Sequence, residues 1–211
     1  MSIADRDQHT VHRLEAFSDI VIGFCLAQSA INLAFPKSPA DQLTVWLNTN
    51  FLLVSFVIIA VLWWLHHRTF SALFVLTTGT VVLNFAILGS LVLSLYLLQV
   101  FIHAVASGQS VLLFLRLWIA SYLLVYALMG ALMLAGIILR QGRLPVDDLR
   151  WAVQRLVVIA ASVLFLAYLA FSGFAQHPHG ILYISLAWAV LMAFVGRVLV
   201  PRLLRRLIPN E

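Results

Sequence analysis

Polar side chains are concentrated in the first apolar segment, near residues 17–35, where a plain hydrocarbon-facing helix would have none. At helical spacing they form two adjoining stripes: Ser18, Ile22, Cys25, Ser29 and Asn32 on one, and Phe24, Gln28 and Ile31 on the other. One interpretation is that this helix lines a water-filled pathway, with Ser29 and Asn32 contacting ions. The other is that its polar groups bond to neighbouring helices. The pathway is favoured, and because one helix cannot enclose a pore, it implies a homo-oligomer.

The ionisable residues at the start of this segment could form a second site. Asp19 lies about one turn into the segment, and Arg13, His66, His67 and Arg68 are expected at the same depth. They could form a structural network that locks the first two helices together, or a proton relay; the network is favoured. Adjacent histidines on a helix point about 100° apart, so His66 and His67 cannot chelate one metal. No metal site, cofactor or catalytic set is predicted.

The elements that carry these residues follow from composition. The chain has 211 residues, of which 63% are hydrophobic and 10% charged, and its mean hydropathy is +1.03. Soluble domains are roughly 45–50% apolar and ~25% charged. The composition therefore predicts an all-α integral membrane protein, with residues 1–211 as one domain. It excludes a soluble enzyme, a disordered regulator and a disulfide scaffold. The basic residues lie near helix ends, which indicates topology, and no nucleic-acid partner is expected.

The apolar segments and the arginines predict a topology. Eleven arginines lie at one set of segment ends, whereas the other set has only Lys37 and Arg116. By the positive-inside rule this favours six spans with both termini in the cytoplasm. The predicted spans are 17–35, 45–65, 73–102, 111–139, 151–175 and 181–200.

Three short motifs carry a resemblance to a known family. Residues 13–19 read Arg-x-x-x-Phe-Ser-Asp, residues 63–70 read Trp-Trp-Leu-His-His-Arg-Thr-Phe, and Leu83-Asn84 follows in the third segment. In this order, and with six predicted spans, the chain resembles the transmembrane protein 175 family, which comprises six-helix prokaryotic proteins and two-repeat lysosomal relatives.

The resemblance implies a potassium-permeable channel that lacks a Thr-Val-Gly-Tyr-Gly filter. It implies a homotetramer whose four first helices line a central pore and form its constriction with Phe24, Gln28 and Ile31. It also implies a structural network near the cytoplasmic end of the pore. The network residues are Arg13, Phe17, Ser18, Asp19, His66, His67 and Asn84.

The expected function is therefore passive cation conduction across a cell membrane, the plasma membrane of a prokaryote, with lipid and monovalent cations as partners. The chain departs from the family pattern in having an amide at Gln28, Ala27 in place of a threonine and Ile20 in place of a glycine. These departures leave selectivity between K⁺ and Na⁺ open. The alternative function is a proton-coupled transporter that uses Asp19 and His66/His67 as its relay.

Overall fold

The computed structural model describes residues 3–31, 42–107, 111–172, 191 and 194–202, and all of its regular elements within these ranges are helices. They are α1 (Ile3–Ile31), α2 (Gln42–Leu73), α3 (Thr78–Ala106), α4 (Leu112–Leu139), α5 (Val146–Phe171) and a short π-helix η2 (Val195–Leu199). Away from their ends, helices close their main-chain hydrogen bonds internally, which hydrocarbon surroundings require. Most of the sixth predicted span, 181–200, lies outside the described residues.

Several predicted boundaries differ from the structure; α2, for example, continues to Leu73 rather than ending at 65, and α5 begins at Val146 rather than at 151. Helix α1 begins at Ile3, well before the apolar run, because its charged first half is helical too. The third segment does not begin at residue 73, because Leu73 ends α2 and α3 begins at Thr78. Thr77 caps α3: its hydroxyl accepts from the Thr80 amide at 3.2 Å, and its own amide donates to Thr80 Oγ1 at 3.1 Å. This capping box starts a new helix without a proline or a nearby charge.

Four of the described helices are long and apolar enough to cross a membrane. They are Asn48–Leu73, Thr78–Val105, Leu112–Leu139 and Val146–Phe171. Helix α1 is not among the candidates found within the described residues. The chain is thus an all-helical membrane protein in its described part, and the six spans and the position of both termini stay predictions.

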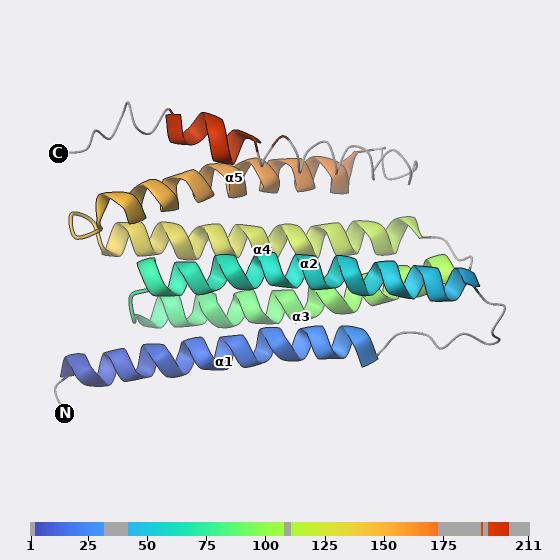
Figure 1. The fold of residues 1–211 in the computed structure, drawn as a ribbon, viewed down its shortest axis with the longest axis horizontal. Helices are drawn as coiled ribbons and strands as arrows, with labels where there is room; N and C mark the ends of the chain where they lie inside the picture. The colour runs from blue at the N-terminus through green and yellow to red at the C-terminus, as the bar shows by residue number, and fades with distance from the viewer. Residues whose placement is uncertain (1–2, 32–41, 108–110, 173–190, 192–193, 203–211) are drawn as a thin grey trace.

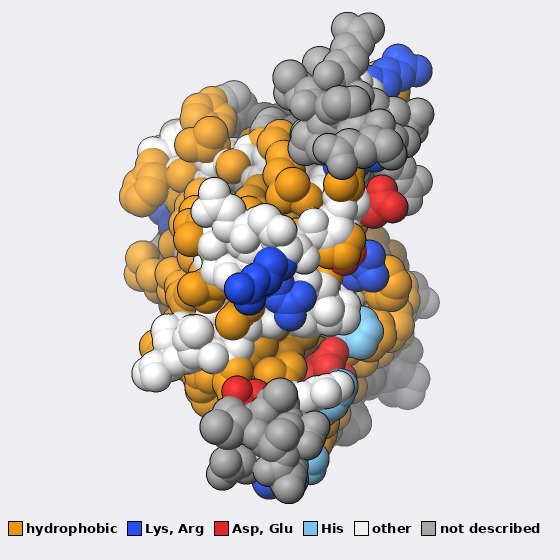
Figure 2. Space-filling model, turned by 90° about the vertical axis from the view of Figure 1, so that its left-hand side faces the viewer, with side chains coloured by type: hydrophobic (Ala, Val, Ile, Leu, Met, Phe, Trp, Pro, Cys, Tyr) orange, Lys and Arg blue, Asp and Glu red, His pale blue; other side chains and the backbone are white. Residues whose placement is uncertain are grey.

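The helices alternate in direction along an antiparallel bundle (Figure 1). The start of α1, the α2–α3 turn and the α4–α5 turn therefore lie at one end. Arg13, Arg68, Arg140 and Arg143 belong to these segments, and we call this end of the molecule the arginine-rich end. Figure 2 views it directly and shows cationic, acidic and histidine side chains among apolar ones.

Close backbone packing and two hydrogen bonds from Arg140 join α4 to the end of α2 here. A Cβ added at Gly136 would lie 2.6 Å from the Leu73 carbonyl oxygen, so only glycine permits this approach of the two backbones. Arg140 donates from Nη1 to the Ala72 carbonyl and from Nη2 to the Phe74 carbonyl, both at 2.9 Å. These bonds satisfy carbonyls that the end of α2 leaves without helical partners.

Helix α1 lies at one edge of the bundle, where it packs against α2 and α3 (Figure 1). Its inward side joins an apolar cluster in which Ile22 and Cys25 contact residues of α2, α3 and α4. Its outward side has no helix of the described bundle against it, so this helix has both a buried face and a free face.

Candidate functional site

The buried face of α1 is held by a chain of hydrogen bonds across three helices. Asn84 of α3 donates from Nδ2 to Ser18 Oγ at 3.1 Å, and its Oδ1 lies 2.7 Å from His66 Nε2 of α2. Ser18 Oγ in turn donates to the Leu14 carbonyl at 2.9 Å. Because Asn84 Oδ1 can only accept, His66 must carry a hydrogen on Nε2. The bonds therefore run in one direction, from α2 through α3 to the backbone of α1.

This chain of hydrogen bonds is buried and closely packed. Ser18 and Asn84 have no solvent exposure and His66 has 1%. The His66 ring also stacks on Phe70, with ring centroids 4.7 Å apart. Its Nδ1 has no hydrogen-bond partner among the described residues. A buried set with most of its polar atoms paired fixes the rotation of each helix, since any rotation would leave polar atoms unpaired.

A second line of contacts joins α1 to α2 on a more exposed side. Trp63 Nε1 donates to Asp19 Oδ1 at 2.9 Å, and His67 Nδ1 lies 3.1 Å from Glu15 Oε1. The Trp63 and His67 rings stack with centroids 5.5 Å apart. Two acids four residues apart on α1 thus face an indole and an imidazole four residues apart on α2.

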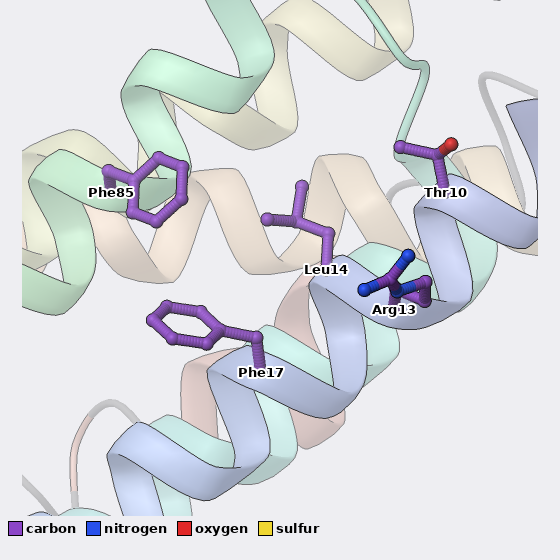
Figure 3. A pocket seen from close by; sticks show the side chains of 5 residues that line it. All are labelled: Thr10, Arg13, Leu14, Phe17 and Phe85. Atoms are coloured by element: carbon purple, nitrogen blue, oxygen red, sulfur yellow. The ribbon is translucent and has the colours of Figure 1, made fainter.

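The predicted network residues are therefore divided among three places. Ser18, His66 and Asn84 are joined directly, whereas Asp19 and His67 are linked through Trp63. Sequence reasoning did not include Trp63 and Glu15; their signal was the matched four-residue spacing on two antiparallel helices. Phe17 contacts neither group and instead faces Phe85 of α3, with ring centroids 5.8 Å apart. Arg13, considered as a partner of Asp19, lies beside Phe17 at a pocket between α1 and α3 (Figure 3).

The first polar stripe does not face a pathway over its described length. Ser18, Ile22 and Cys25 are all buried against α2 and α3, because Ser18 finds its partner in Asn84. Ser29 and Asn32 continue this stripe by spacing, but their side chains lie outside the described residues. Of the two interpretations of this stripe, bonding to a neighbouring helix is the one that Ser18 follows, through its hydrogen bond with Asn84.

The second stripe lies on the free side of α1. Phe24 is 66% exposed and Gln28 is exposed, while the side chain of Ile31 lies outside the described residues. Ile20, one turn before Phe24, is 69% exposed and was not among the predicted pore residues. Phe24 and Gln28 also border a groove of about 610 Å³ between α1 and α3, whose other wall includes Val92 and Tyr96.

A family model described as the endosomal/lysosomal potassium channel TMEM175 matches residues 13–95. This segment belongs to the TMEM175 family. It runs from Arg13 of α1 to Leu95 of α3 and so contains both groups of contacts described above. No curated protein and no solved structure gives a significant match to the chain.

The TMEM175 family is one of potassium channels rather than enzymes. Residues 13–95 therefore match an ion-channel family, and four helices of the described residues are long and apolar enough to cross a membrane. The matched segment is the part of the chain that builds α1 and locks it against α2 and α3. Helices α4 and α5 lie beyond it.

Proposed function

We propose that the chain forms a homotetrameric, potassium-permeable cation channel whose pore is lined by four copies of α1. The observation that carries this proposal is the two-sided character of α1. Its inner side is closed by the bonds of Ser18 with Asn84, and its free side presents Ile20, Phe24 and the amide of Gln28. An amide on a free helix face is costly in hydrocarbon but suits a water-filled passage. The membership of residues 13–95 in a potassium-channel family supports the same function.

In this proposal the pore has apolar and amide levels. Rings of Phe24 and Ile31 form constrictions that close by losing water, and four Gln28 amides between them offer oxygen atoms to a partly hydrated cation. No Thr-Val-Gly-Tyr-Gly filter is needed. Amide oxygens accept both K⁺ and Na⁺, so moderate selectivity is expected. The channel needs no resident cofactor, and its membrane is the plasma membrane of a prokaryote.

The position of Asp19 bears on how the inner mouth attracts cations. Asp19 and Phe24 are five residues apart, which places them about 140° apart around the helix. Asp19 binds Trp63 on the α2 side, so it does not share the free face with Phe24. It would therefore act on ions through its field rather than by direct contact.

The alternative, a proton-coupled transporter, has weaker support from the geometry. His66 bonds to the Asn84 amide, and the chain of bonds then ends at the Leu14 carbonyl. An amide side chain does not take up and release protons near neutral pH, so this chain of hydrogen bonds does not favour a proton relay. An Asp19→Asn variant that keeps its cation flux would favour the channel, whereas loss of pH-driven uptake alone would favour the transporter.

The proposal is tested by K⁺ and Na⁺ flux into proteoliposomes. We expect wild-type flux to favour K⁺, Gln28→Leu to change the K⁺/Na⁺ ratio, and Phe24→Ala to raise basal flux by widening the constriction. Leu164→Ala is the matched control. Leu164 is 72% exposed, but its helix, α5, lies on the opposite side of the bundle from α1 (Figure 1). No flux from folded, oligomeric protein would refute the channel. Equal effects of Phe24→Ala and Leu164→Ala would refute the pore lining.

A further inference from the structure

Three consecutive residues of α2 each contact a different helix at the arginine-rich end. His66 belongs to the buried chain of hydrogen bonds with α3. His67 Nδ1 lies 3.1 Å from Glu15 Oε1 of α1, and Arg68 Nη2 donates to Asp148 Oδ1 of α5 at 3.1 Å. Residues that follow one another on a helix point about 100° apart, so a single turn of α2 reaches three neighbours.

The start of α5 holds the Arg68 guanidinium on two sides. Besides the ion pair with Asp148, its Cζ lies 5.5 Å from the centroid of the Trp151 ring, which is close enough for a cation–π contact. Trp151 packs against the apolar cluster that contains Phe70 and Leu73 of α2, so it offers Arg68 a fixed surface. Asp148 lies in the first turn of α5, where the helix end also favours a carboxylate. Arg68 therefore ties α2 to a well-anchored part of α5.

This tie connects α1 with a helix on the other side of the molecule. Helices α1 and α5 lie at opposite sides of the bundle, and α2 packs against both (Figure 1). The contacts of α2 with α5 and with α1 are made by neighbouring residues, Arg68 and His67. Helix α5 also lies beyond residues 13–95, so the tie joins the segment that matches the channel family to the rest of the chain.

We propose that Arg68 is a positioning residue for the pore: through it, the start of α5 restrains α2 and thereby the angle at which α1 presents Phe24 and Gln28. This inference rests on the proposed function, because it concerns the same face of α1. Glu15 and Phe24 lie on one continuous helix, so a rotation of α1 at Glu15 turns Phe24 by a similar angle. Coupling over such a distance needs a contiguous set of contacts, and the adjacent contacts of Arg68 and His67 supply one.

The test combines hydrogen–deuterium exchange of α1 residues 10–19 with K⁺ flux into proteoliposomes, both on the full chain. Asp148→Asn should fold, because the Arg68 and Asp148 side chains are 44% and 25% exposed and such ion pairs contribute little to folding. We expect it to raise α1 exchange about two- to fivefold, the factor that one exposed ion pair can contribute to an equilibrium. Basal K⁺ flux should rise by a similar factor, because the apolar rings of a less restrained α1 are no longer held at their closest spacing.

Asp147→Asn is the matched control. Asp147 also lies in the first turn of α5, but it pairs within its own helix, with Arg150 at 3.8 Å. It should therefore leave exchange and flux unchanged. Asp148→Glu keeps the carboxylate and should stay near wild type. Arg68→Gln combined with Asp148→Asn should add little to either change alone, because both remove the same contact.

Three results would overturn the inference. The first is wild-type exchange of α1 in Asp148→Asn. The second is an equal rise in Asp147→Asn, which would trace the effect to the charge at the start of α5 rather than to Arg68. The third is a rise in exchange with unchanged flux, which would show that the tie holds α1 without positioning the pore. Wild-type protein without any flux would refute the proposed function, and that failure is told apart because the exchange comparison needs no conduction.

Discussion

Replacing Asn84 with leucine should destabilise the protein strongly while changing little of its shape. Asn84 has no solvent exposure and makes hydrogen bonds to two other helices, with Ser18 at 3.1 Å and His66 at 2.7 Å. Leucine has a similar volume, so a cavity contributes little. The loss therefore comes from polar atoms alone.

The expected size can be worked out from these contacts. Two interhelical hydrogen bonds in a membrane contribute ~0.6 kcal/mol each. Ser18 keeps its bond to the Leu14 carbonyl, whereas the Nε2–H of His66 loses its partner. Leaving that buried donor unpaired costs ~1–3 kcal/mol. Asn84→Leu should therefore lower the free energy of unfolding by about 2–4 kcal/mol.

The assay is equilibrium unfolding of the protein in mixed micelles by titration with sodium dodecyl sulfate, followed by circular dichroism. Asn50→Leu is the matched control, because Asn50 is exposed and bonds only to the Trp46 carbonyl of its own helix. It should change stability by less than about 0.5 kcal/mol. If both variants unfold alike, the buried chain of hydrogen bonds does not stabilise the packing of α1, and the reasoning fails.

Two further predictions concern the arginine-rich end. Gly136→Ala should cost about 1–3 kcal/mol by overpacking against the Leu73 backbone. Gly130→Ala should cost less, because its Cβ would meet only side chains, that of Ile159 at 3.1 Å and that of Leu156 at 4.0 Å. The same titration compares the two variants, and equal losses would contradict the backbone contact. Arg140→Gln should cost about 1.5–3 kcal/mol because it leaves the Ala72 carbonyl at the end of α2 and the Phe74 carbonyl just after it without their donor. The exposed Arg143→Gln should be near neutral by thermal unfolding. Equal melting shifts of the two arginine variants would remove the proposed cap.

The contacts of the network illustrate the limit of sequence reasoning. Ser18, His66 and Asn84 could be selected from the sequence because polar residues in apolar helices are rare. Their pairing could not, because it depends on the rotation of three helices about their axes. Trp63 belongs to the motif of residues 63–70, yet that motif did not show that Trp63 donates to Asp19.

The free face of α1 shows the same limit. Helical spacing separates Phe24 from Ser18, and the structure leaves Phe24 exposed and Ser18 buried. Spacing alone assigned the polar stripe to the pathway, because a polar face can meet water or polar partners, and the sequence of α1 does not show which. The amide of Asn84, 66 residues away, decided it for Ser18.

By itself, the sequence determined the class of the protein, the apolar segments and the residues whose polarity is unusual, because transfer to hydrocarbon depends on each side chain separately. The motifs of residues 13–95 also carried the family. Only the tertiary structure decided that α3 supplies Asn84 to Ser18, that Trp63 donates to Asp19, and that Arg13 lines a pocket with Phe85. These contacts join residues far apart in the chain, and they follow from how the helices pack, which no single segment specifies.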